Sequence, residues 1–90
     1  MSRHTIRVIG LVNGHQSKID GEYLSFYDPD GHYGKGEIHT TPDITEAQIF
    51  RDTAEAFELW MLQSKRFPLR ADGQPNRPLT AFNILVETKD

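Results

Sequence analysis

Histidine and serine are the side chains of this chain that could carry out acid–base or nucleophilic chemistry. They include His4, His15, His32, His39, Ser17, Ser25 and Ser64. The histidines form no HxxH or HExxH pair, and a zinc site needs three or four converging ligands. The serines lie outside any GxSxG motif, and the chain has no Cys. We therefore expect a protein that is not an enzyme and that uses no metal or other cofactor.

Two short motifs hold groups that could bind ions. Asp28-Pro29-Asp30-Gly31 places carboxylates at alternate positions, but Tyr33 and His39 stand where a calcium loop of the EF-hand type needs Gly and an acid. Residues 31–36 (GHYGKG) have the spacing GxxGxG rather than GxGxxG, and no strong helix start follows to supply oriented amides. These motifs predict a turn followed by a flexible hairpin loop.

Three tyrosines, Tyr23, Tyr27 and Tyr33, lie on or just after one predicted strand. Aromatic rings on a strand can stack on the bases of single-stranded nucleic acid, but Glu22 and Asp28 flank these rings where a basic surrounding is needed. A protein interface fits tyrosine better, because the side chain combines a large contact area with a polar tip. The alternative is that the rings are half-buried at the edge of the sheet.

A basic, proline-rich segment follows the main predicted helix. Residues 67–78 (FPLRADGQPNRP) contain Arg70, Asn76 and Arg77, and Arg66 comes just before them. Arginines on a stiffened loop lose less entropy when they bind an anion, so Arg70, Asn76 and Arg77 join Tyr23, Tyr27 and Tyr33 as the predicted partner-binding residues. The alternative is that the polar residues hold the loop onto its own domain.

Charge and composition limit the class of protein. The net charge is −3, with basic residues prevailing at 1–19 and 59–78 and ten acids against two basic residues at 20–58. Ninety residues with 37% hydrophobic content predict one folded domain, residues 1–90, rather than a disordered tail. No stretch is apolar enough to span a bilayer or to resemble a signal peptide, so we expect a cytoplasmic protein.

Hydrophobic patterning predicts four strands, at residues 5–12, 22–27, 37–41 and 79–87. Thr41-Pro42-Asp43 predicts the start of a short helix that ends near Phe50. A longer helix is predicted over 54–65, with Asp52 as its N-cap and one apolar stripe facing the sheet. That stripe consists of Phe57, Trp60, Met61 and Ser64.

The predicted order, β-β-β-short α-α-β, favours a small two-layer α+β domain with a twisted antiparallel sheet of about four strands on one main helix. The last strand follows a long connection and need not pair with its neighbour in sequence. Alternation places Val8, Phe26, Phe82 and Ile84 on the helix side. The opposite side then carries Ile9, Leu11, Tyr23, Tyr27, Ala81 and Leu85, and this apolar face predicts a homodimer or another docked partner. The alternative is a monomer in which the 67–78 loop covers the face.

Several spaced segments resemble small proteins encoded by tailed phages and prophages of Gram-negative bacteria. The segments are EYLSFYDPD at 22–30, GKG at 34–36, TPD at 41–43, AEAF at 54–57 and PLRADGQPNRPLTAF at 68–82, together with Ala47, Phe50 and Trp60. The resemblance covers about residues 22–87. It implies a phage or prophage gene and a place in the cytoplasm of the infected host, and it implies no mechanism.

These observations favour a non-catalytic accessory protein that binds a host or phage protein, with inhibition of a defence or replication enzyme as one such role. Two alternatives come from other classes. The basic segment 65–77 could bind nucleic acid directly, although the net charge of −3 disfavours this. Conversely, Asp52, Glu55 and Glu58 could imitate a DNA backbone and occupy a DNA-binding enzyme.

Overall fold

Four strands and two helices make up the fold in the computed structural model, which describes residues 3–89. The strands are β1 (Arg3–Leu11), β2 (Tyr23–Asp28), β3 (Glu37–Thr41) and β4 (Phe82–Lys89), and the helices are α1 (Gly31–Gly34) and α2 (Thr53–Trp60). Two 3-10 turns, η1 (Ile44–Glu46) and η2 (Pro78–Ala81), complete the order. Among the described residues, no helix has the length and apolar character needed to cross a membrane.

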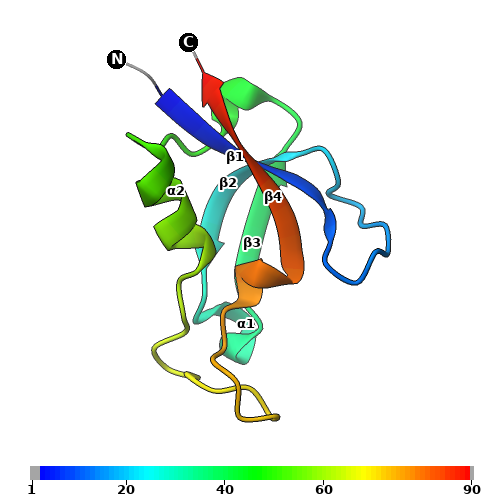
Figure 1. Ribbon diagram of the computed structural model, residues 1–90, viewed down its shortest axis with the longest axis vertical. Helices are drawn as coiled ribbons and strands as arrows, with labels where there is room; N and C mark the ends of the chain where they lie inside the picture. Colours follow the sequence, from blue (N-terminus) through cyan, green and yellow to red (C-terminus); the bar gives the residue numbers. More distant parts are fainter. Residues whose placement is uncertain (1–2, 90) are drawn as a thin grey trace.

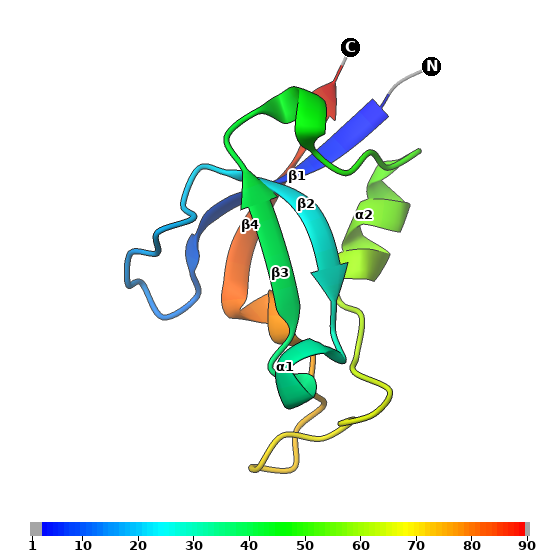
Figure 2. The same cartoon turned by 180° about the vertical axis from the view of Figure 1, so that it is seen from behind.

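The sheet has the strand order β3-β2-β1-β4, and every neighbouring pair is antiparallel. The last strand pairs with β1 along almost its whole length rather than with β3, as its long connection permits. This open sheet with one main helix confirms the predicted α+β class. Figures 1 and 2 show that the β1–β4 pair crosses the β2–β3 pair steeply, with α2 beside the region where the pairs separate.

The β1 and β2 strands meet around one register position, Arg7 opposite Tyr23, and then diverge. The chain after η1 bridges the gap between them. Phe50 exchanges backbone hydrogen bonds of 2.9 and 3.0 Å with His4 of β1, and Gln48 N–H donates to Leu24 O of β2 at 2.9 Å. This extended bridge replaces the short helix that was predicted to continue to Phe50, because backbone groups of two strands would otherwise lack partners. Only the 3-10 turn η1 remains of that helix.

A bulge in β2 reverses the side-chain alternation that the sequence predicts. The pairing with β3 shifts between Leu24 and Phe26, so Tyr27 joins Leu24 on the core side. Tyr27 is 7% exposed, whereas Phe26 is 45% exposed and contacts the ring of His39 on the outer side. The assignment of Phe26 to the core and Tyr27 to the outer face was therefore wrong, because a bulge inserts one residue and changes the face of those that follow.

The core lies between the concave side of the sheet and α2. Its buried residues are Ile6, Leu24, Tyr27, Phe50, Ala56 and Leu79, and the partly buried residues against them are Ile38, Leu59, Trp60, Phe82, Ile84 and Val86. Trp60 also donates its indole N–H to Phe82 O at 3.1 Å, which fixes α2 to β4. The predicted core positions Phe82 and Ile84 are confirmed.

The main helix is shorter than predicted and is rotated relative to the predicted stripe. Asp52 caps it as expected, accepting a hydrogen bond from Glu55 N–H at 2.8 Å. The helix ends at Trp60, and it buries Ala56, Leu59 and Trp60, while Phe57 and Met61 are nearly half exposed. Apolar residues occur on all sides of residues 57–62, so their spacing does not define a single stripe.

The last strand also begins later than predicted. Leu79 is buried within η2 rather than in a strand, and β4 starts at Phe82. The connection between α2 and η2 consequently spans residues 61–77, and we refer to it as the long loop.

Candidate functional site

The long loop is fixed to the rest of the domain by one carboxylate. Asp30 Oδ1 accepts hydrogen bonds from Ser64 Oγ at 2.7 Å and from the backbone N–H groups of Lys65 at 2.8 Å and Arg66 at 3.0 Å. The bonds from Arg66 N–H and Ser64 lower the pKa of Asp30 below its ordinary value. The DPDG turn thus holds the start of the loop, a role that its sequence does not reveal.

Asn76 fastens the other end of the same loop. Its side-chain amide donates to Gly34 O at 2.7 Å and to Phe67 O at 3.0 Å, while its backbone carbonyl accepts from Ser64 N–H at 2.9 Å. Because the amide N–H groups are used within the chain, Asn76 positions the loop. This agrees with the alternative that polar residues of the segment hold it onto its own domain.

The short helix α1 lies directly against the loop. A Cβ built on Gly34 would fall 2.6 Å from Phe67 Cβ, so only glycine permits this approach, and Gly34 also has a φ of +86°. The preceding Tyr33 has a φ of +58°, a left-handed conformation that costs energy for a residue with a side chain. This turn directs Tyr33 outward, and its side chain is 89% exposed.

The end of the molecule built by α1 and the long loop carries exposed apolar and basic side chains together. Tyr33 is 89% exposed, Leu69 61% and Phe67 38%. Arg66 and Arg70 are also exposed within the same loop. Figure 2 shows α1 and the loop at the end of the domain opposite to the chain termini. We call these five residues the docking surface: Tyr33, Arg66, Phe67, Leu69 and Arg70.

A hollow of about 460 Å³, the basic pocket, adjoins the docking surface. It is lined by Val12, Gly34, Lys35, Arg70, Asn76, Arg77, Pro78, Thr80 and Ala81. The structure thus brings together three of the predicted partner-binding residues, Arg70, Asn76 and Arg77. Lys35 joins them from the end of α1. In the sequence, Lys35 stands within GKG at 34–36. The spacing of this segment does not match a phosphate-binding loop, so the sequence alone does not predict Lys35 as a binding residue.

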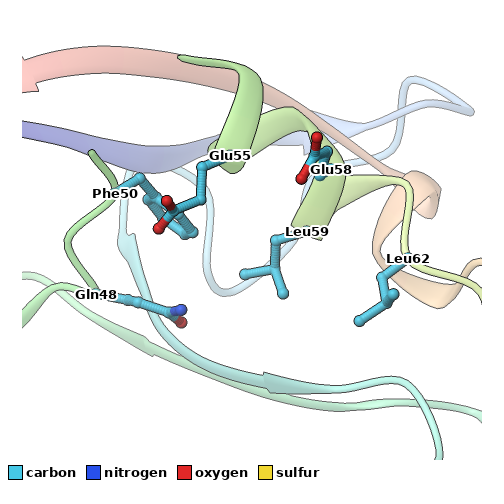
Figure 3. Close-up of a pocket in the computed structure, with 6 residues that line it drawn as sticks. All are labelled: Gln48, Phe50, Glu55, Glu58, Leu59 and Leu62. Carbon is cyan, nitrogen blue, oxygen red and sulfur yellow. The ribbon is translucent and has the colours of Figure 1, made fainter. Parts of the chain in front are cut away.

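A second hollow of about 310 Å³ lies between α2 and the segment that follows η1, and its charged lining residues are acidic. Figure 3 shows Gln48 and Phe50 at one end of this groove and Leu62 at the other, with Glu55, Glu58 and Leu59 contributed by α2. Glu55 accepts a hydrogen bond from Arg51 Nε at 2.8 Å, and Asp52 caps the helix. Two of the three acids considered for imitation of DNA therefore have partners within the chain.

The three predicted binding tyrosines occupy three different environments. Tyr27 is buried, and its hydroxyl accepts from Leu79 N–H at 3.1 Å and donates to Leu62 O at 3.4 Å. Tyr23 is half-buried on the outer side of the sheet, with the Arg7 guanidinium 5.5 Å from its ring centroid. Tyr33 is part of the docking surface. The prediction that Tyr27 belongs to a binding surface is wrong, because its ring and hydroxyl belong to the core.

Comparison with known proteins gives no relative: the chain matches no protein-family model, no curated protein and no solved structure. Within residues 3–89, no three histidine or acidic side chains lie together in a way that could hold a metal ion.

Proposed function

We propose that this chain is a non-catalytic binding protein that docks on another protein through the docking surface. The observation that carries the proposal is the way the surface is built. The long loop contributes few side chains to the core, yet Asp30 and Asn76 fix both of its ends with five side-chain hydrogen bonds. A loop that is already ordered loses little conformational entropy when a partner binds.

The chemistry of the surface indicates the character of the partner. Tyr33 and Leu69 supply exposed apolar area, and tyrosine is among the side chains that contribute most to protein interfaces. Arg66 and Arg70 add positive charge beside this area, with Asp72 as the acid that pairs with Arg70. The complementary partner presents an apolar patch bordered by carboxylates, and opposite charges would speed the encounter and fix the orientation.

The resemblance to phage and prophage proteins gives this proposal a biological setting. In that setting the partner is a host or phage protein, and occupation of a defence or replication enzyme is a role that requires no catalytic residues. The −3 net charge favours a protein partner over a nucleic acid, because affinity for phosphate chains depends on concentrated positive charge.

The proposal is tested with immobilised protein in lysate of a Gram-negative host, with captured proteins identified by mass spectrometry and then purified. The variant Tyr33→Ser/Leu69→Ser should reduce affinity for the purified partner by roughly tenfold or more, because truncation of a central interface residue costs more than about 1 kcal/mol. The matched control is Ile49→Ser, which removes a side chain that is 39% exposed on the segment after η1. Equal affinity of both variants would show that the docking surface is not the site.

A further inference from the structure

Three cations line the basic pocket, and they come from two distant parts of the chain. Lys35 follows α1, whereas Arg70 and Arg77 belong to the long loop. None of the nine residues that line the pocket is acidic. Like charges gathered around one hollow repel each other unless an anion lies between them, so this arrangement favours an anionic ligand.

Two of the three cations are available to such a ligand. Arg70 forms an ion pair with Asp72, and Asp72 also accepts from Gln74 N–H at 3.0 Å. Across residues 3–89, neither Lys35 nor Arg77 forms an ion pair. Arg77 can offer two parallel N–H donors to oxygens of one phosphate, and Lys35 adds a compact charge.

The pocket has an apolar side as well as a basic one. Val12, Pro78 and Ala81 line it, and Val12 N–H donates to Ala81 O at 2.9 Å, which holds the end of β1 against η2. A Cβ on Gly36 would fall 2.6 Å from Pro78 Cβ, so this wall rests directly on the backbone after α1. The walls are therefore formed before a ligand arrives.

The volume of the basic pocket indicates which class of anion fits it. Pockets for small organic ligands have volumes of roughly 300–1,000 Å³, and the basic pocket, at about 460 Å³, lies in this range. Inorganic phosphate would fill only a small part of it and would leave the apolar wall uncovered. A ligand in which a phosphate monoester is attached to a flat ring would contact both the basic and the apolar side of the pocket.

We infer that the basic pocket binds a small organic phosphate monoester of the nucleoside monophosphate type. The phosphate contacts Lys35 and Arg77, and the ring lies against Val12, Pro78 and Ala81. The inference goes beyond the proposed protein docking, because the ligand is a small molecule and the residues used for its test lie outside the docking surface.

The test is an NMR titration of the ¹⁵N-labelled protein with AMP at about 50 mM salt, where phosphate contacts are weakly screened. Saturable shifts should centre on the amides of Val12, Lys35, Arg77 and Ala81. Lys35→Gln and Arg77→Gln should each weaken AMP binding about tenfold, as expected for the loss of a charged hydrogen bond. Arg3→Gln, which removes the same charge from an exposed position at the start of β1, outside both the pocket and the docking surface, should leave the affinity unchanged. Adenosine, which lacks the phosphate, should bind at least tenfold more weakly than AMP.

Three results would overturn the inference: no saturable shift up to about 10 mM AMP, equal shifts with adenosine, or equal losses in Arg3→Gln and Arg77→Gln. A second arm compares an oligonucleotide bearing a 5′-phosphate with the same strand bearing a 5′-hydroxyl. Preference for the 5′-phosphate, lost in Arg77→Gln, supports the same site with the monoester at a strand end. Equal binding of both strands without AMP binding would mean nonspecific attraction to the backbone and would contradict the pocket. If AMP binding fails these tests while Arg77→Gln still captures the protein partner, the inference of a phosphate ligand fails and the proposed protein docking stands.

Discussion

The carboxylate of Asp30 accepts a hydrogen bond of 2.7 Å from the hydroxyl of Ser64, a residue that is 1% exposed just beyond the end of α2. Because the same carboxylate oxygen also accepts from the next two backbone N–H groups, Asp30 holds residues 64–66 against the DPDG turn. One acid in a turn therefore determines where the docking surface begins.

The first prediction concerns this carboxylate. Asp30→Ala removes the acceptor shared by three donors, so the amides of Lys65 and Arg66 should exchange with solvent roughly tenfold faster. Amides in the β1–β4 pair should change little, because the sheet does not depend on the loop. Hydrogen exchange measured by NMR tests this, and uniform acceleration across the sheet would argue against a local role for Asp30.

Low pH should release residues 64–66 of the long loop, as Asp30→Ala does, because protonation weakens the acceptor. The pKa of folded Asp30 lies below its ordinary value of 3.8, so its stabilising contribution is complete above that value. It is then lost as the pH falls through the lower folded pKa. We expect the signals of residues 64–66 to change with pH in that acid range in the wild type, and this dependence should vanish in Asp30→Asn. Persistence of the same transition in the variant would assign it to another acid.

The buried hydroxyl of Tyr27 leads to a prediction about stability. Tyr27→Phe leaves the buried N–H of Leu79 without its acceptor, and we expect the free energy of unfolding to fall by about 1–3 kcal/mol. The control is Tyr23→Phe, in which the ring beside Arg7 is kept, and its effect should stay within about 0.5 kcal/mol. Denaturant unfolding followed by the fluorescence of Trp60 measures both. Equal stability of the two variants would contradict the role of the Tyr27 hydroxyl.

The sequence was sufficient for the fold class and for most strands, since β3 spans the predicted residues 37–41 and the alternation in β4 identifies the core positions Phe82 and Ile84. It could not reveal the bulge at residues 25–26, because a bulge depends on pairing with β3 and leaves no local signature. The basic residues Arg70 and Arg77 of the long loop were recognisable from the sequence. The position of Lys35 beside them and the contact of Asp30 with the long loop were not, because both depend on residues more than thirty positions away in sequence.

The outer face of the sheet supplies a prediction about self-association. Ile9, Phe26 and Leu85 are 54%, 45% and 48% exposed there, and monomers seldom leave such apolar patches uncovered. We predict a homodimer, with a mass near twice 10.3 kDa in light scattering at high protein concentration. Phe26→Glu/Leu85→Glu should yield the monomer mass and an intact core. A wild-type protein that remains at the monomer mass would show that the face does not mediate dimerisation.

We propose that Tyr33 of α1 and Leu69 of the ordered long loop bind a protein partner. The most direct measurement is the dissociation constant for the purified partner of three proteins: the wild type, Tyr33→Ser/Leu69→Ser, and Asp30→Ala. Tyr33→Ser/Leu69→Ser should lose roughly tenfold or more in affinity because it removes contacts with the partner. Asp30→Ala keeps both side chains, but it should weaken binding because the long loop is less ordered before the partner binds. Unchanged affinity in both variants would contradict docking through Tyr33 and Leu69.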